Sequence, residues 1–302
     1  MRKNFRNKYR YLKFLLIMIP SLVLWFTLCI YPNLQTIPLS FYKWSSVSLK
    51  RTFVGFRNYR TIFNDSSMVA QLRNTLLYVL FFVAVMAVLS LLMALVLQKN
   101  TRQNKIFRTY IFLPLTFSSV LVGLTWGFMY DANLGILNNL LTAVGLKSFN
   151  GFAWLGTATR GVIAAAVINI WAGLGYPLTF YVAGLQTIPR DLYEAADVEG
   201  ASPFQTFLHI TMPQLAPIFL RLTLLSFIGA TMAFDYIYVL GSTLVANSYD
   251  TWAVSMFRKV ASAGVSENFG IPAALGVMLG LALALIFIIQ YFGTKKAEEH
   301  AG

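Results

Sequence analysis

The sequence is short of charged residues, of cysteine and of histidine, and each shortage excludes a class of protein. Only 12% of its 302 residues are charged, whereas 57% are hydrophobic. Soluble domains carry about 25% charged residues, so this composition and the mean hydropathy of +0.64 indicate a membrane protein. The net charge of +13 comes from basic residues beside apolar runs, as in membrane proteins. Nucleic-acid binding would instead require a basic stripe with stacking aromatics in a polar domain.

The single cysteine, Cys29, excludes a disulfide within the chain and a thiolate metal site. The two histidines, His209 and His300, lie in no metal-ligand spacing, so no metal site is expected. The sequence has no G-x-x-x-x-G-K-[ST] phosphate loop, and we expect this chain to bind no cofactor of its own. It also lacks an H-E-x-x-H motif, paired intramembrane aspartates and a G-x-S-x-G motif. An intramembrane enzyme is therefore not indicated.

Long apolar runs are abundant, and six of them reach the roughly 20 residues that a membrane-spanning helix needs. None alternates with a period of two, so each is predicted to be helical. The sequence therefore predicts an all-α integral membrane protein with six transmembrane helices, at residues 13–32, 72–97, 107–130, 159–185, 213–234 and 270–292.

Basic residues set the expected orientation. The first 13 residues, MRKNFRNKYRYLK, carry six basic residues and no acid, and the 98–106 segment holds Lys99, Arg102 and Lys105. Cytoplasmic segments carry such an excess. The first run lacks a small-x-small cleavage site, so we expect a retained helix. Both termini and segments 98–106 and 186–212 are thus predicted to be cytoplasmic, although the outer 33–71 segment is also basic.

One short segment differs from the rest of the chain. Four of the eleven acidic residues lie within the nine positions 191–199. Pro189 suits a first helical position, Gly200 suits a left-handed helix end, and Ser202 followed by Pro203 suits the start of another helix. Residues 186–212, which we call the elbow, are therefore predicted to form a helix, a sharp turn and a second short helix, with Pro213 opening the fifth span.

The elbow has the composition of a docking surface. Ala195, Ala196 and Gly200 leave a surface of low relief, and Asp191, Glu194 and Asp197 share a stripe at spacings of three. Small residues permit close approach, and carboxylates can pair with arginines of a partner. The alternative is a solvated amphipathic elbow that lies on the membrane surface without a partner.

The same stretch resembles the signature loop of ABC importer permeases, E-A-A, three residues, G, nine residues, I-x-L-P. Here Glu194-Ala195-Ala196 is followed by Gly200, Ile210 and Met212-Pro213, with methionine where leucine is usual. The stretches FVGFRNYRTIF, RNTLLYVL and FDYIYVL resemble the carbohydrate-uptake branch of that family. The resemblance covers residues 10–292, and FVGFRNY resembles the first of the two unlike permeases that these systems pair.

The resemblance implies a type I ABC importer permease fold and a transport subunit that is not itself an enzyme. It divides the chain into an arm, first helix and outer loop at 1–71, a permease domain at 72–292 and a cytoplasmic tail at 293–302. It implies four partners: a second unlike permease, an ABC ATPase dimer that binds ATP and Mg, an extracytoplasmic sugar-binding protein and membrane lipid. The implied location is the bacterial cell membrane. The implied ATPase-coupling residues are Tyr193, Glu194, Ala195, Ala196, Asp197, Gly200, Ala201, Ile210 and Pro213.

Sugars are held by hydrogen bonds and aromatic faces, so polar and aromatic residues inside spans are candidates for the substrate pathway. They are Asn169, Trp171, Tyr176, Tyr181, Asp235 and Tyr236. For the aromatic ones, ordinary packing or an interfacial belt is the alternative. For the whole chain, the competing function is a stand-alone secondary transporter or channel. Such a protein would need intramembrane acids or inverted repeats, and it would have no use for the elbow.

Overall fold

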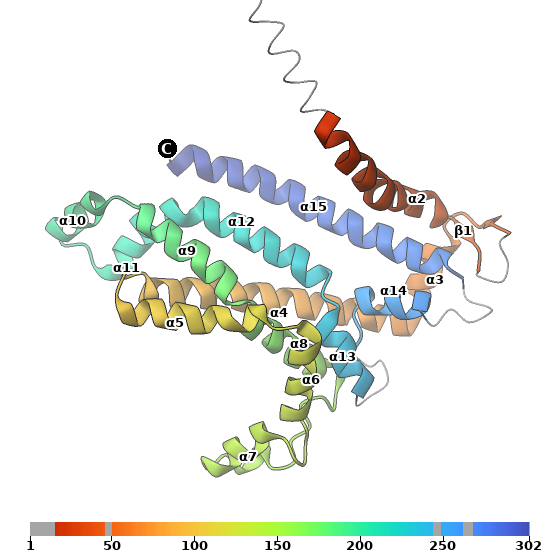
Figure 1. Cartoon of the computed structure of the whole chain (residues 1–302), viewed down its shortest axis with the longest axis horizontal. Coiled ribbons are helices and arrows are strands. Elements are labelled where there is room, and N and C mark those ends of the chain that lie inside the picture. Colours follow the sequence, from red (N-terminus) through yellow and green to blue (C-terminus); the bar gives the residue numbers. More distant parts are fainter. Residues whose placement is uncertain (1–15, 46–49, 244–248, 262–267, 302) are drawn as a thin grey trace, which may run out of the picture. The chain divides into compact units, whose positions relative to one another are not determined.

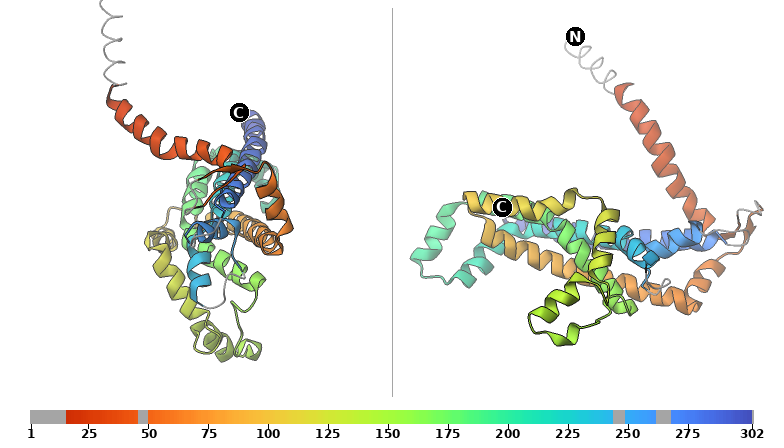
Figure 2. Two further views of the ribbon diagram at one scale, coloured as in Figure 1. Left: turned by 90° about the vertical axis from the view of Figure 1, so that its right-hand side faces the viewer. Right: turned by 60° about the horizontal axis from the view of Figure 1, so that its bottom comes forward.

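The computed structural model describes residues 16–45, 50–243, 249–261 and 268–301. It divides into two compact units, which Figures 1 and 2 show as ribbons. Unit 1 comprises Met1–Asp65 and Met256–Leu279, and unit 2 comprises Ser66–Ser255 and Gly280–Gly302. The basic arm predicted at the N-terminus and the side chains beyond residue 293 lie outside the described residues. The predicted division at 71 and 292 stays a prediction.

Unit 1 begins with an apolar helix, Leu16–Leu39, whose large side chains are exposed as lipid-facing ones would be. It contains a π-helical turn, η1 (Phe26–Ile30), and α2 (Tyr31–Leu39). The antiparallel strands β1 (Tyr42–Lys43) and β2 (Thr52–Phe53) follow, and then α3 (Arg57–Asn64). The buried Asn58 joins these parts, because its Nδ2 donates to Ser40 O at 2.7 Å and Tyr42 O at 3.0 Å.

Unit 2 is a helical bundle. Its helices along the chain are α4 (Ser66–Leu97), α5 (Arg102–Phe112), η2 (Leu113–Thr116), α6 (Ser119–Met129), α7 (Ile136–Ala143), η3 (Lys147–Phe149), α8 (Ala158–Gly173), α9 (Gly175–Thr187), α10 (Arg190–Val198), α11 (Pro203–Thr206), η4 (Phe207–Thr211), α12 (Met212–Thr231) and α13 (Asp235–Thr243). Two further helices, α14 (Trp252–Ala261) and α15 (Gly270–Ala301), contribute residues to both units.

The core of unit 2 forms around α4, which packs against α8, α9 and α12 (Figure 1). One stripe of α4, with Tyr78, Phe82 and Met86 at spacings of four, is buried, whereas Leu80 on the opposite side is more than half exposed. A helix that is apolar all round is typical of a membrane span. The buried stripe faces the bundle, and the other side is left for lipid.

Among the described residues, four helices are long and apolar enough to cross a membrane, and up to six spans result if each of two bent pairs is one span. The bent pairs are Arg102–Thr116 with Ser119–Met129, at 100°, and Ala158–Gly173 with Gly175–Thr187, at 48°. The predicted span over 107–130 is therefore interrupted and is not one continuous helix. Pro114 lies in the 3₁₀ turn η2, and Phe117 after it is extended, so the α-helix ends there.

The second bend brings two backbones together. A Cβ atom added at Gly175 would lie 2.5 Å from Phe112 Cα, closer than any real Cβ contact. Only glycine lets α9 begin against the end of α5.

A segment between α6 and α8 is held together by one buried amide. Asn138 Nδ2 donates to Ala132 O at 2.9 Å and Phe152 O at 3.0 Å, and Asn138 Oδ1 accepts from Trp154 Nε1 at 2.7 Å. Nearby, the backbone N–H groups of Leu134 and Asn133 hold the pKa of the Asp131 carboxyl below its ordinary value.

Asn138→Ala is expected to loosen this segment, because it leaves three buried or half-buried polar groups without partners. The cost of such a loss is about 2 kcal/mol, which corresponds to roughly 30-fold more frequent local opening. The rate of limited proteolysis within residues 130–157 measures how often this segment opens. Asn139→Ala is the matched control, since Asn139 is exposed. Equal cleavage of both variants would contradict the role given to Asn138.

Candidate functional site

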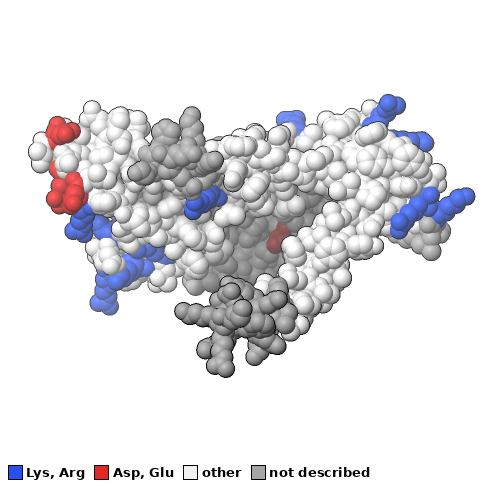
Figure 3. All heavy atoms as spheres, turned by 90° about the horizontal axis from the view of Figure 1, so that it is seen from above, with Lys and Arg blue, Asp and Glu red and all other residues white. Residues whose placement is uncertain are grey.

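Two features of unit 2 carry the sequence-predicted residues: the elbow and a cavity inside the bundle. The elbow lies at the end of unit 2 where α9 ends and α12 begins (Figure 1). The space-filling view in Figure 3 shows the acidic residues gathered at that end, with Lys and Arg side chains beside them.

The first helix of the elbow, α10, is confirmed at Arg190–Val198. Pro189 is its N-cap residue, with ψ at 136°, and not its first helical residue as predicted. The residue before a helix keeps an extended ψ, and Arg190 is free to begin the helix. Asp191 lies in the first turn, where the positive end of the helix dipole favours a carboxylate.

The turn of the elbow is a complete Schellman motif. Gly200 has a φ of +73°, in the left-handed region that glycine adopts without strain. The N–H of Ala201 donates to Ala196 O at 2.9 Å, and the N–H of Gly200 donates to Asp197 O at 3.1 Å. These two bonds satisfy carbonyls at the end of α10 and confirm the predicted sharp end.

The second helix of the elbow begins with a capping box. Ser202 Oγ accepts from Gln205 N at 3.4 Å, Gln205 Oε1 accepts from Ser202 N at 2.8 Å, and Pro203 is the first helical residue. The prediction of a separate short helix that ends before Pro213 is wrong. From Pro203 the helix continues through η4 into α12, because Pro213 falls in the first turn of α12, where its missing N–H is tolerated.

The acids and the small residues of α10 lie on different faces. Asp191, Glu194 and Asp197 are exposed and fall on the side opposite the buried Ala196. We call these three residues the acidic stripe, and the 88% exposed Val198 lies within it. Ala195, Ala196, Gly200 and Ala201 instead line a hollow of about 540 Å³ on the inner side of the elbow, together with Glu199, Gln205, His209 and Ile210.

Two predicted coupling residues remain, Tyr193 of α10 and Pro213 of α12. The Tyr193 hydroxyl lies 3.2 Å from Thr211 Oγ1 and so connects α10 to η4. Pro213 is exposed in the first turn of α12. The elbow is therefore a small rigid body, with two helices fixed by a turn, a capping box and this hydroxyl pair.

Side chains of α5 and of the elbow both bond to backbone carbonyls at the end of α4 and just after it. Arg108 of α5 donates to the last carbonyl of α4 through Nε to Leu97 O at 3.0 Å, and to the segment after α4 through Nη2 to Lys99 O at 2.9 Å. Gln186, the first residue of the elbow, donates to Gln98 O at 3.2 Å. Arg108 is thus a cap of α4, a role that charge counting does not reveal.

The cavity has a volume of about 400 Å³ and lies where two helices break. Gly173 and Tyr176 line it at the α8–α9 bend, and Met232, Ala233 and Phe234 line it between α12 and α13. Irregular backbone at membrane depth is tolerated where it lines a cavity. A volume of this size is typical of small-molecule sites.

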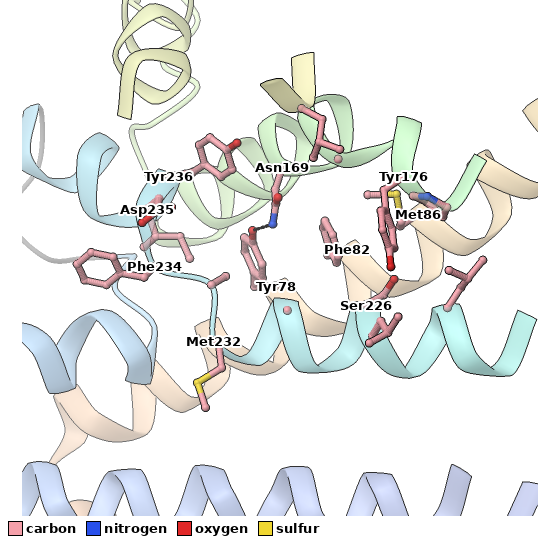
Figure 4. Close-up of a pocket in the computed structure, with 18 residues that line it drawn as sticks. Tyr78, Phe82, Met86, Asn169, Tyr176, Ser226, Met232, Phe234, Asp235 and Tyr236 are labelled. Atoms are coloured by element: carbon pink, nitrogen blue, oxygen red, sulfur yellow. Dashed lines mark hydrogen bonds between the residues drawn. The ribbon is translucent and has the colours of Figure 1, made fainter. Parts of the chain in front are cut away.

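Aromatic and polar side chains share the lining of the cavity (Figure 4). Asn169 Nδ2 donates to the Tyr78 hydroxyl at 2.8 Å, which leaves the phenol proton for a ligand oxygen. The Asp235 carboxylate is exposed, and its Oδ2 accepts from Ser119 Oγ at 2.7 Å. The aromatic members of the lining are Tyr78, Phe82, Tyr176, Phe234 and Tyr236.

Four of the six predicted pathway residues thus meet in one cavity: Asn169, Tyr176, Asp235 and Tyr236. The other two do not line it. Trp171 packs edge-on against Trp126 at 5.6 Å and lines a separate apolar hollow. Tyr181 is 1% exposed and belongs to a hydrophobic cluster with Leu178 and Leu185.

The sequence prediction missed Tyr78 and Ser226 in the cavity and His209 and Gln205 in the elbow hollow. A tyrosine inside an apolar run is usually core, and no local pattern marks Tyr78 as a partner of Asn169, 91 positions away. Serine inside the apolar 213–234 run was a usable signal for Ser226.

A family model described as "Binding-protein-dependent transport system inner membrane component" matches residues 86–296. The chain is 31% identical over 288 residues to "Probable ABC transporter permease protein YurN" of Bacillus subtilis, covering 94% of this chain and 97% of that protein. It is 30% identical over 302 residues to "Arabinooligosaccharides transport system permease protein AraP" of Halalkalibacterium halodurans, covering 98% and 92%.

A solved structure has the same fold. It is a bacterial ABC transporter involved in the import of the acidic polysaccharide alginate. A chain of that transporter superposes with a TM-score of 0.79 at 21% identity, covering 97% of this chain and 99% of the other. At this identity the likeness shows the fold alone.

Proposed function

The chain belongs to the family of binding-protein-dependent transport system inner membrane components, and from this premise we propose that it is one permease subunit of an ATP-driven importer for a sugar or an oligosaccharide. The observation that carries the proposal is the elbow. A stiff helix–turn–helix with an exposed acidic stripe is suited to transmit force from another protein.

The elbow is the proposed ATPase-coupling site. The acidic stripe pairs with basic residues of a separate ATPase subunit, which supplies ATP and Mg because this sequence has no phosphate loop. The Schellman turn at Gly200 and the capping box at Ser202 keep the two elbow helices at a fixed angle. Closure of an ATPase dimer would then move α12 directly, since α11, η4 and α12 form one continuous helix.

The cavity is the proposed part of the sugar pathway in this chain. Hydroxyl, amide and carboxylate groups from Tyr78, Asn169 and Asp235 meet aromatic rings there. Sugars present both hydroxyls and apolar ring faces, which such a lining can bind. The arabinooligosaccharide permease among the relatives supports a carbohydrate as the transported molecule.

Three further partners follow from the family. A second, unlike permease would complete the pathway, and an extracytoplasmic sugar-binding protein would deliver the substrate. The family description, which names a binding-protein-dependent transport system, supports the second of these partners. The proposed location is the bacterial cell membrane, where lipid covers the exposed apolar helices. Both termini, the α4–α5 segment and the elbow would face the cytoplasm, where the basic residues of 98–108 are favoured.

Deleting the gene from its own host tests the proposal. Uptake of labelled arabinotriose, maltotriose, cellobiose and lactose is measured before and after deletion and after return of the gene. We expect uptake of at least one sugar to be lost and restored. That uptake should continue with a protonophore and stop when ATP is depleted. Uptake that follows the proton gradient instead would favour the stand-alone secondary transporter.

Asn169→Ala is expected to lower the uptake of that sugar about tenfold, because it removes one hydrogen-bonding group and frees the Tyr78 hydroxyl. The initial uptake rate at limiting sugar concentration measures the loss. Tyr181→Phe is the control, since Tyr181 lies outside the cavity and should retain normal uptake. Normal uptake by Asn169→Ala would contradict the placement of the pathway.

A further inference from the structure

We propose that Asp235 makes the cavity selective by charge, so that it accepts neutral or amino-bearing sugars and rejects sugars that carry a carboxylate or phosphate. The inference rests on the proposed function, because it names the substrate class that the same cavity would take. It concerns a property of the cavity that can also be measured without any sugar.

The carboxylate of Asp235 is placed to meet a ligand. It is exposed, it lines the cavity, and the close-up shows it beside Tyr236 (Figure 4). An ionised carboxylate has about four acceptor sites, and the hydrogen bond from Ser119 to Oδ2 uses one of them. Sites remain for sugar hydroxyls or for an ammonium group.

No cation among the described lining residues balances this charge. Among the described residues that line it, Asp235 is the one charged side chain, and Lys, Arg and His are absent from that lining. Much of the wall is apolar, with Phe82, Met86, Leu222 and Leu225. A charge in such surroundings is screened less than in water, so a second negative charge is repelled and a positive one is attracted.

The helix that begins at Asp235 explains how the charge is tolerated. Asp235 is the first residue of α13, and the N-terminal end of a helix favours a negative charge. A carboxylate that pointed away from the cavity would stabilise α13 equally well, so the helix does not explain why Asp235 lines the cavity. The exposure of Asp235 to the cavity and its pairing with Ser119 of α6, 116 positions away, are what point to a ligand.

The single cysteine of the chain makes a direct test possible. In the full transporter complex carrying Cys29→Ser, a probe cysteine is introduced as Ala233→Cys, in the cavity lining next to Asp235. The purified complex is treated with a cationic methanethiosulfonate bearing a trimethylammonium group and with an anionic one bearing a sulfonate. The labelling rate of the cationic reagent is divided by that of the anionic reagent. This ratio is then divided by the same ratio measured with free 2-mercaptoethanol.

We expect this normalised ratio to exceed one, and Asp235→Asn to lower it about fivefold or more. Asp235→Glu should keep it high, and so should Ser119→Ala, which removes the hydrogen bond but not the charge. A control cysteine at the exposed Ser148 of η3 should not respond to Asp235→Asn.

A ratio near one with Asp235 present, an unchanged ratio in Asp235→Asn, or failure of both reagents to reach the cysteine would overturn the inference. These outcomes are separate from a failure of the proposed function. Deletion of the gene without loss of uptake of any tested sugar would refute sugar import even if the labelling showed a strong preference for the cation.

Discussion

Glu194→Arg is expected to abolish ATP-driven sugar uptake while the chain remains in the membrane with its partner permease. The Glu194 side chain is exposed in the middle of the acidic stripe, on the face opposite the packed Ala196, so the substitution should not disturb the elbow itself. Removing one member of a buried charge pair costs about 2–5 kcal/mol. Reversal of the charge should therefore weaken binding of the ATPase roughly a hundredfold or more.

The measurement for Glu194→Arg is a mild-detergent pull-down of the tagged chain, with uptake assayed in the same cells. The second permease should be retained and the ATPase lost. Glu199→Arg makes the same change of charge on the hollow side of the elbow and should keep most of the ATPase. Unchanged uptake in Glu194→Arg would contradict the docking role, and equal losses in both variants would show that the acidic stripe is not the docking face.

Gly200→Val is expected to reduce uptake and ATPase binding about tenfold. Gly200 has a φ of +73°, and a left-handed conformation costs an L residue about 1–2 kcal/mol, with β-branched residues affected most. No atom lies within 4 Å of an added Cβ, so the whole effect comes from the backbone. The Schellman bonds from Ala201 to Ala196 and from Gly200 to Asp197 would be strained or lost.

Gly200→Asn is the matched control, because asparagine visits the left-handed region more readily than other side chains. It should retain most of the uptake and the ATPase in the assays used for Glu194→Arg. Equal losses in Gly200→Val and Gly200→Asn would mean that the absence of a side chain matters, and not the left-handed turn.

The elbow could be predicted from the sequence because its determinants are local. Gly200, Ser202 and Pro203 specify a helix end and a helix start within four positions, and the Gly200 turn and the Ser202 cap follow the prediction. The prediction was wrong for the two prolines, because each is compatible with two different positions relative to the start of a helix. Pro189 suits both an N-cap and a first helical position, and Pro213 suits both the start of a helix and the first turn of a longer one.

The bent helices and the cavity could be predicted only in part. Apolar residues continue across the break at Phe117 and across the bend between Gly173 and Gly175, so hydropathy gives a single run in each place. The partners that shape the cavity lie far apart in the chain, as for Tyr78 with Asn169 and Ser119 with Asp235. Residue type suggested Asn169 and Asp235 as pathway residues, and it suggested Trp171 and Tyr181 equally. Only the packing of the bundle shows that the first two line the cavity and that the last two do not.

The most direct test of the coupled importer is uptake by proteoliposomes that contain the transporter complex purified through this chain. The sugar identified in the deletion experiment and its binding protein are added outside, and ATP with Mg is enclosed or omitted. Uptake that needs both enclosed ATP and the binding protein is the predicted result. Uptake by this chain alone, at the same rate without ATP, would contradict the importer mechanism and identify the protein as a stand-alone transporter.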